Sequence, residues 1–155
     1  MHFESPEDKR YFHDLLCASG EDLSRYASLF DFRPPTIKRR EFDCQRARLR
    51  SELVKRYGHV CQLRYSDKCD IQSGIVIDHL IPLASNKLNK ELRHLPALPS
   101  KKVASQSFGS NHPNNLVLAC LHCNNHKKHR LLTSEQFRPL LQLKGLSIQN
   151  EVASP

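Results

Sequence analysis

Neither a membrane span nor a secretory leader can be found in this sequence. No apolar run approaches the roughly 20 residues that cross a bilayer, and no N-terminal segment combines a charged start, an apolar stretch and a cleavage site. Tryptophan is absent, and hydrophobic residues make up only 39% of the 155 residues. We therefore expect a cytoplasmic protein of one domain, with a modest core and no membrane contact.

The charge of the chain is strongly unbalanced. Lysine and arginine total 24 against 16 acidic residues, which gives a formal charge of +8 and a pI near 9.4. Such a surplus favours an anionic polymer as partner, and nucleic acid is the first candidate. Double-stranded DNA is the expected partner, although charge alone does not separate DNA from RNA.

The N-terminal part of the chain is predicted to be helical. Apolar spacing and breakers indicate helices over residues 5–18, 22–30 and 37–57. In the first of these, Tyr11 and Leu15 are expected to face the core. The third carries many basic side chains, and we expect it to contact phosphates through three of them: Arg39, Arg46 and Arg50. A solvated charged face is the competing interpretation of this helix.

Two apolar segments farther along the chain are predicted to be strands. They cover 71–83 and 116–120, and a polar insertion over 84–111 separates them. Thr133 with Gln136 forms a capping-box pattern, which predicts a last helix. The predicted class is therefore α+β. The expected organisation is a basic helical region at 1–57 that packs on the core, the core itself at 58–132 with the insertion, and a C-terminal helix and tail at 133–155.

Four of the six cysteines stand at spacings that suit a metal. Cys120 and Cys123 form a Cys-x-x-Cys pair, and Cys61 and Cys69 flank a seven-residue loop. Four thiolates make the closed set that tetrahedral structural zinc prefers. The alternatives are a redox pair or unrelated buried thiols. The other two cysteines, Cys17 and Cys44, are expected to be small buried apolar residues.

Asp78 and His79 lie inside an otherwise apolar segment, where an acid and an imidazole are costly unless something uses them. Imidazole titrates near neutral pH and can act as a general base. A carboxylate is a hard oxygen ligand of the kind that magnesium prefers. Adjacent residues of a strand point to opposite faces, so the two can serve one site only where the strand ends or twists.

The segment after Cys123 is predicted to be a helix. At about 100° per residue, Asn124, Lys127 and Lys128 share the face of the cysteines. Asn124 is then a candidate metal ligand through its amide oxygen, and the two lysines are candidates for contacting phosphate. The histidines of the segment fall on the opposite side: His122, His126 and His129. A separate metal site on His122 and His126 is the less favoured alternative.

Taken together, these residues resemble the HNH endonuclease family. The resemblance rests on Asp78-His79, on Asn115 before the strand LVLAC, and on Cys120-x-x-Cys123-Asn124, and it spans about half of the chain. It implies a ββα-metal core in which two short strands and a helix hold one catalytic divalent ion beside a structural zinc. Two departures stand out: the final ligand is Asn rather than the histidine of many members, and the first cysteine pair is stretched.

The resemblance also implies a role for each matched residue. His79 corresponds to the general base, Asp78 to a metal ligand, and Asn115 to the asparagine that holds the strand and loop and so orients the histidine. Asn124 corresponds to the last metal ligand, where an amide favours Mg²⁺ or Mn²⁺ over a softer ion. The implied function is hydrolysis of DNA phosphodiester bonds.

Two other functions stay open at this point. One is a zinc-stabilised nucleic-acid-binding or adaptor subunit of a larger defence or restriction complex, which would bind without cutting. The other is a thiol redox protein that holds no zinc. One site of this kind cuts one strand, so double-strand cleavage would need a homodimer or two visits. The sequence does not specify which DNA is recognised.

Overall fold

The computed structural model describes residues 1–83, 106–128 and 130–146. The regular elements follow one another in this order: α1 (Pro6–Leu16), the 3-10 helix η1 (Leu23–Leu29), α2 (Pro35–Tyr57), the 3-10 helix η2 (Ile71–Ser73), β1 (Ile75–His79), the 3-10 helix η3 (Pro113–Asn115), β2 (Leu116–Cys120), α4 (Leu121–Lys127) and α5 (Ser134–Leu143). The predicted α+β class is confirmed. Within the described ranges, no helix is both long and apolar enough to cross a membrane.

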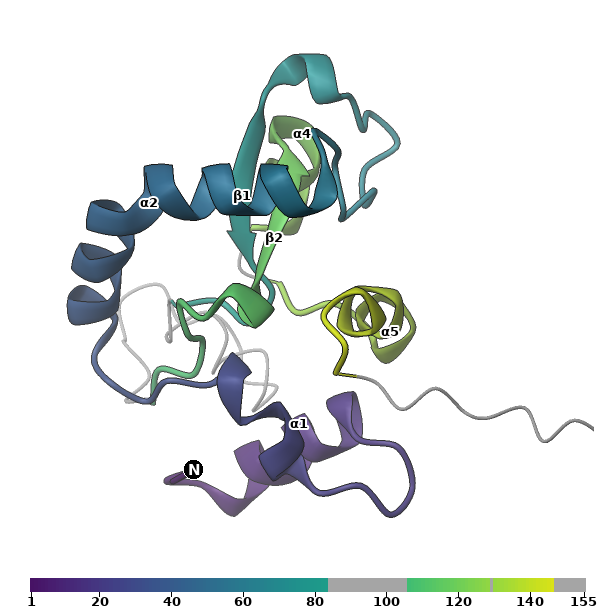
Figure 1. Ribbon diagram of the computed structural model, residues 1–155. Coiled ribbons are helices and arrows are strands. Elements are labelled where there is room, and N and C mark those ends of the chain that lie inside the picture. Colours follow the sequence, from purple (N-terminus) through teal and green to yellow (C-terminus); the bar gives the residue numbers. More distant parts are fainter. Residues whose placement is uncertain (84–105, 129, 147–155) are drawn as a thin grey trace, which may run out of the picture.

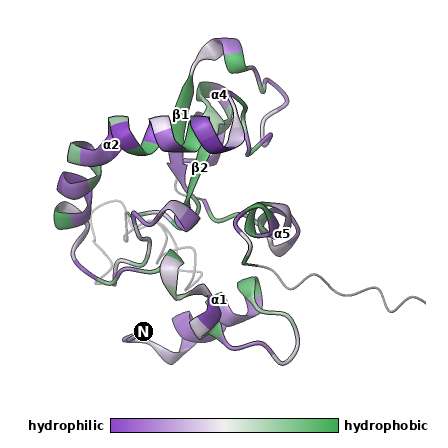
Figure 2. Ribbon diagram, in the orientation of Figure 1, coloured by the Kyte–Doolittle hydropathy of each residue, from purple (hydrophilic) through white to green (hydrophobic). Residues whose placement is uncertain are grey.

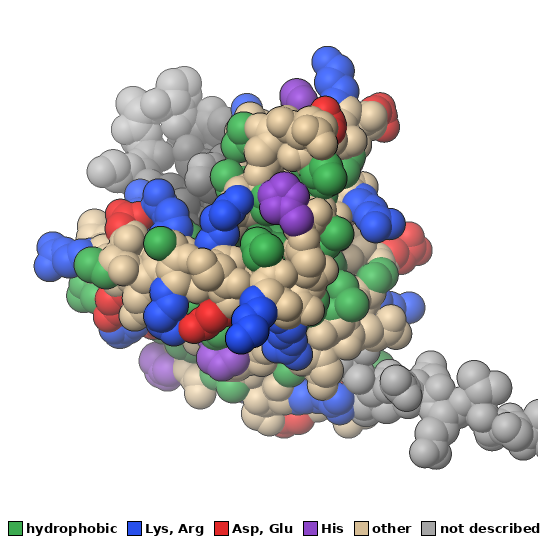
Figure 3. All heavy atoms as spheres, turned by 45° about the horizontal axis from the view of Figure 1, so that its top comes forward, with side chains coloured by type: hydrophobic (Ala, Val, Ile, Leu, Met, Phe, Trp, Pro, Cys, Tyr) green, Lys and Arg blue, Asp and Glu red, His purple; other side chains and the backbone are tan. Residues whose placement is uncertain are grey.

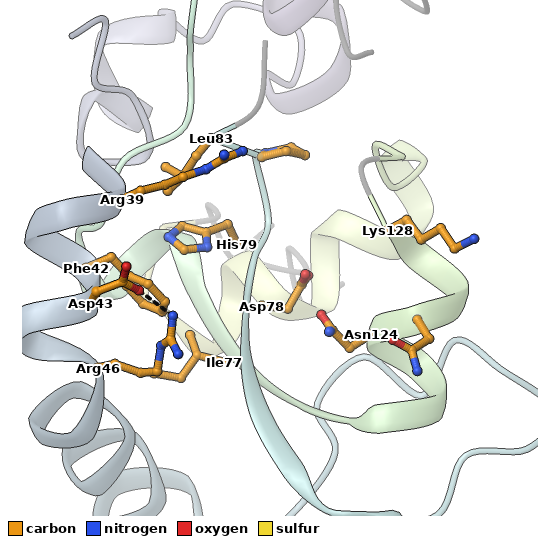
Figure 4. Close-up of a pocket in the computed structure, with 12 residues that line it drawn as sticks. Arg39, Phe42, Asp43, Arg46, Ile77, Asp78, His79, Leu83, Asn124 and Lys128 are labelled. Carbon is orange, nitrogen blue, oxygen red and sulfur yellow. Dashed lines mark hydrogen bonds and ion pairs between the residues drawn. The ribbon is translucent and has the colours of Figure 1, made fainter. Parts of the chain in front are cut away.

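A two-stranded antiparallel sheet lies at the centre of the molecule. β1 pairs with β2 so that Ile75 lies opposite Cys120 and His79 opposite Leu116. α2 and α4 each contact both strands, and they flank β1 on opposite sides (Figures 1 and 4). All five residues of β2 are buried. β1 is shorter than the predicted strand, because a 3-10 turn ending at Gly74, with φ of 108°, precedes it.

β2 contributes to two apolar clusters. Leu116 and Leu118 pack with the buried side of α2, which includes Phe42. Val117 points to the other cluster, where α1, η1 and α5 meet around Phe12. In Figure 2 the strands are largely hydrophobic, but β1 turns hydrophilic at its end, where the acid and the imidazole lie. The sheet therefore joins both halves of the core and presents its polar end at one edge.

The buried face of α1 differs from the predicted one. Phe12 is fully buried and Leu16 is 7% exposed, whereas Tyr11 and Leu15 are only half-buried. The stripe that packs is therefore shifted by one residue from the expected one. Both stripes have helical spacing, and the aromatic ring of Phe12, which packs against Phe108, decides between them.

The last residues of the predicted insertion form a buried segment. Residues 106–110 are all buried, and Gly109 pairs with Phe30 in an isolated β-bridge. Lys38 of α2, itself fully buried, donates its Nζ to the carbonyl oxygens of Gly109 and Asp31, at 2.7 and 2.6 Å. This lysine fastens α2 to the segment, so it serves the fold and is not free to contact phosphate.

Replacement of Gly109 by alanine is expected to destabilise the protein strongly. A Cβ there would clash with the carbonyl oxygen of Ile81 and lie 2.7 Å from that of Pro82. Backbone cannot move aside cheaply, so we expect a loss of at least about 3 kcal/mol in the free energy of unfolding, measured by chemical denaturation. Gly145→Ala is the matched control. It has open space but a φ of +69°, and it should cost about 1 kcal/mol. Equal losses for the two variants would contradict the packing described.

Candidate functional site

Four cysteine sulfurs come together where the loop after α2 meets the junction of β2 and α4. The Sγ atoms of Cys61, Cys69, Cys120 and Cys123 all lie within 4.8 Å of one another, and those of Cys69 and Cys120 are 3.9 Å apart. Ligands of a tetrahedral zinc ion, each about 2.3 Å from the metal, lie about 3.8 Å apart. The predicted grouping is confirmed, including Cys69 of the stretched pair, and the four sulfurs could hold one metal ion such as zinc.

Backbone N–H groups also point at this cluster. Tyr65 and Ser66 donate to the sulfur of Cys123 at 3.2 and 3.4 Å, and the N–H of Cys123 donates to Cys120 at 3.4 Å. Burial raises the pKa of Cys120, but hydrogen bonds from Cys123 and Asp70 outweigh it and lower the pKa to about 6. Because thiolates are the ligating form, this environment fits a metal of borderline softness.

The two remaining cysteines lie outside the cluster. Cys17 is half-buried, and burial raises its pKa to about 11. Cys44 is exposed, so the expectation that it is a buried apolar residue is wrong. It lies on the solvent side of α2, where the helical face that packs on the sheet does not reach.

A cleft of about 480 Å³ opens beside the polar end of β1 (Figure 4). Three elements form it, and half of its lining residues are predicted site residues. The lining residues are Arg39, Phe42, Asp43 and Arg46 of α2; Ile77, Asp78 and His79 of β1 with Pro82 and Leu83 after it; and Asn124, Asn125 and Lys128 at α4. Asp78 projects from β1 toward α4 and His79 toward α2 (Figure 4). The strand alternation therefore holds, and the cleft at the strand end still reaches both side chains.

Asp78 lies deep in the cleft wall beside a buried lysine. Its side chain is 8% exposed, and its Oδ2 lies 3.0 Å from Nζ of Lys127. Within the described residues, Lys127 is the one partner of this oxygen. Burial raises the pKa of the carboxyl group, and the charge of Lys127 opposes that rise. A carboxylate oxygen has lone pairs that can bind a hard cation such as Mg²⁺.

The predicted phosphate contact of Lys127 is wrong. Its side chain has no exposed surface, and its Nζ donates to the backbone oxygen of His79 at 3.0 Å. Lys127 thereby ties α4 to the end of β1 and supplies the charge opposite Asp78. Its neighbour Lys128 is exposed at the cleft rim and stays a candidate for that contact.

His79 is held in one orientation by Asn111. Nε2 of the imidazole lies 2.8 Å from Oδ1 of Asn111, and Nδ2 of the same amide donates to the carbonyl oxygen of Lys38 at 2.7 Å. Because that carbonyl can only accept, the amide must present its oxygen to the imidazole. Nε2 therefore carries the proton, and in the neutral ring Nδ1 is the unprotonated nitrogen.

The surroundings of His79 keep the imidazole neutral. Burial lowers its pKa to about 4, and the nearby charges of Lys127, Lys38 and Arg39 lower it as well, against the hydrogen bond of Asn111. The ring of Phe42 packs against it edge to face, with centroids 4.7 Å apart. A neutral imidazole with an unprotonated nitrogen can accept a proton at physiological pH.

Asn115 fastens the two loops that frame the cleft. Its Oδ1 accepts from the N–H of Ile81 at 2.8 Å, and its Nδ2 donates to the carbonyl oxygens of Ile81 and Ser110, at 3.0 and 2.8 Å. The side chain is fully buried. Its side-chain hydrogen bonds within the described residues go to Ile81 and Ser110 and not to His79. It holds the chain that leaves β1 against the residue before Asn111, and so acts on the imidazole through the loops.

Asn124 and the histidines of α4 lie on different sides of the helix. Asn124 lines the cleft. His122 and His126 are exposed away from it, and the ring of His126 packs against Tyr65 at 5.0 Å between centroids. His129 lies outside the described residues. Asp78 and Asn124 thus offer hard oxygen donors from two elements to one cleft, and this donor set fits Mg²⁺ or Mn²⁺, which retain several water ligands.

The arginines of α2 extend from the cleft along the helix. Arg39 and Arg46 line it, and Arg46 pairs with Asp43 while its guanidinium lies 5.2 Å from the ring centroid of Phe42. Arg50 continues the same face and donates Nε to the carbonyl oxygen of Ile75 at 3.1 Å. Lys and Arg side chains outnumber acidic ones on the face drawn in Figure 3. The predicted contacts of the insertion lie outside the described residues: Lys87, Lys90, Arg93, Lys101 and Lys102.

Comparison of the chain with protein-family models, with curated proteins and with solved structures finds no match. Roles for the cleft residues are therefore inferred from their geometry and chemistry alone.

The pKa of His79, measured by NMR titration, is expected near 4. As pH falls from 6.5 to about 4 the unfolded chain takes up this proton first, so His79 contributes a loss of stability over that window. Asn111→Leu removes the hydrogen bond that favours the charged ring and should lower the pKa further. Asn114→Leu is the control, because Asn114 bonds to Ser28 and not to His79. A pKa near 6.5 in the wild type would contradict the half-buried, neutral imidazole.

Proposed function

We propose that this chain is a metal-dependent endonuclease of the HNH type that hydrolyses phosphodiester bonds in DNA. The observation that carries the proposal is the convergence on one basic cleft of an oriented, neutral imidazole and two hard oxygen donors. A phosphodiester hydrolase needs a base for water, a cation for the leaving oxygen, and groups that hold both. His79, Asp78 and Asn124 meet these needs from β1 and α4.

His79 is the general base of the proposed reaction. Nδ1 takes the proton of the attacking water, while Asn111 holds Nε2–H and keeps this tautomer. Protonation makes the imidazole cationic, and the hydrogen bond of Asn111 favours that charge as it develops. Asn115 and Lys127 hold the loops and the strand end, so the base keeps its place during the reaction.

Asp78 and Asn124 would hold the catalytic divalent ion, Mg²⁺ or Mn²⁺. When bound, such an ion offsets negative charge on the leaving oxygen, which in the resembled family is the 3′-oxygen. Lys127 stays beside Asp78 as a fixed charge. It compensates the buried carboxylate when no other cation is near.

Zinc on the four clustered cysteines is the proposed structural ion. Thiolate ligands must stay reduced, which agrees with a cytoplasmic location. The proposed DNA contacts are Arg39, Arg46, Arg50 and Lys128 around the cleft, and backbone contacts of this kind position the duplex without reading its sequence. A homodimer or a larger defence complex would bring two such sites to opposite strands.

The ion pair of Asp78 with Lys127 supports a second candidate. It already balances the charge of the carboxylate at 3.0 Å, as a structural pair would. This second candidate is a zinc-stabilised nucleic-acid-binding or adaptor subunit, which binds DNA without cutting it. Such a protein would need the ion pair of Asp78 and Lys127 only to stabilise its fold.

A plasmid-nicking assay distinguishes the two candidates. The wild-type chain is expected to nick supercoiled DNA with Mg²⁺ or Mn²⁺ and to stop with EDTA. His79→Ala removes the base and should lower the cleavage rate by a factor of about 10² or more, while DNA binding measured by fluorescence anisotropy changes little. His126→Ala is the matched control and should cut like the wild type, because His126 lies outside the cleft.

Either of two results would overturn the nuclease proposal. One is binding of DNA by the wild type without nicking under either ion, which would favour the adaptor. The other is equal cleavage by His79→Ala and wild type in preparations free of contaminating nuclease, which would exclude His79 as the general base.

A further inference from the structure

The four cysteines of the cluster differ sharply in their access to solvent. Cys120 and Cys123 are fully buried and Cys61 is 4% exposed, whereas Cys69 is exposed. Cys69 is therefore the residue of the cluster that a dissolved oxidant meets first.

The hydrogen bonds of the cluster increase this difference. The backbone N–H groups that point at sulfur in the described ranges end on Cys120 and Cys123, and none of them ends on Cys69. A hydrogen bond withdraws electron density from a thiolate and lowers its nucleophilicity. The most exposed cysteine of the cluster therefore receives none of these backbone bonds, and its sulfur accepts a hydrogen bond from the thiol of Cys120.

Cys120 lies in position to trap an oxidised Cys69. Their Sγ atoms are 3.9 Å apart, so a disulfide bond of about 2.05 Å needs a shift of about 2 Å. Cys69 sits in the loop before η2, outside any helix or strand, and can make that shift. Cys120 is fixed by its pairing with Ile75 at the end of β2.

We propose that Cys69 is a peroxide-sensitive thiol that forms a disulfide with Cys120 and thereby releases the metal ion of the cluster. In the first step the Cys69 thiolate attacks hydrogen peroxide. The O–O bond breaks, hydroxide leaves, and the sulfur is oxidised by two electrons to sulfenic acid. In the second step the Cys120 thiolate attacks that sulfur and a second hydroxide leaves. In total, two thiolates and one peroxide give one disulfide and two hydroxides.

Loss of the ion follows because two of its four ligands are then joined to each other. The remaining pair, Cys61 and Cys123, cannot close a tetrahedral site. Cys123 precedes Asn124 directly, so release of the ion also loosens the start of α4 on which one wall of the cleft stands. The switch requires that the cysteines hold an ion, and it does not require that the cleft cuts DNA.

The test uses the full chain loaded with zinc and treated with hydrogen peroxide. Released zinc is measured with a chromogenic chelator, and the chain is analysed by intact mass and peptide mapping. The expected result is one zinc released per chain, with loss of two hydrogens and a mapped Cys69–Cys120 disulfide. No bound zinc, retention of zinc under peroxide, or a disulfide between other cysteines would overturn the proposal.

Cys69→His sharpens the test because it replaces the thiol with another zinc ligand, which gives the Cys₃His set of many structural sites. This variant should bind one zinc per chain and release it at least about tenfold more slowly. Cys44→Ser removes an exposed thiol outside the cluster and should release zinc like the wild type. Equal release from Cys69→His and wild type would contradict the role of Cys69. If Cys69→His fails to fold, the disulfide map of the wild type decides alone.

Discussion

The junction between β2 and α4 is the constraint on which the cleft depends. β2 runs into α4 without a loop, and the two cysteines at this junction, Cys120 and Cys123, share one cluster with Cys61 and Cys69. Four sulfurs on one ion would tie the loop after α2, the sheet and α4 together within a few ångströms. The direction of α4, and with it the place of Asn124 at the same cleft as Asp78, would follow from that tie.

The cleft is built mainly by polar contacts that are themselves buried. Lys127 joins α4 to the end of β1, Lys38 joins α2 to the loop around Gly109, and the amide of Asn115 joins that loop to the chain after β1. A buried polar group left without its partner costs about 1–3 kcal/mol, so each contact resists displacement. Together they hold the imidazole of His79 at the end of β1 against α2, with Nε2 hydrogen-bonded to Asn111.

The sequence predicts those parts of the site that depend on the spacing of residues close together in the chain. The Cys-x-x-Cys pair, the capping box at Thr133 and the separation of Asn124 from the histidines of α4 all follow from helical or metal-ligand geometry. Contacts between distant segments could not be predicted in this way. Asn111 reaches His79 across 32 residues, and no local pattern separates it from the neighbouring asparagines. The burial of Lys127 likewise depends on where the sheet lies.

The proposed site in the cleft between α2, β1 and α4 should bind a hard divalent ion, and paramagnetic relaxation by Mn²⁺ in amide-resolved NMR spectra can locate that ion. Because relaxation falls steeply with distance from the ion, we expect sub-stoichiometric Mn²⁺ to broaden the resonances of Asp78 and Asn124 first, and Asp78→Asn to weaken the effect by about tenfold. Broadening centred on His122 and His126, or no localised broadening, would contradict it.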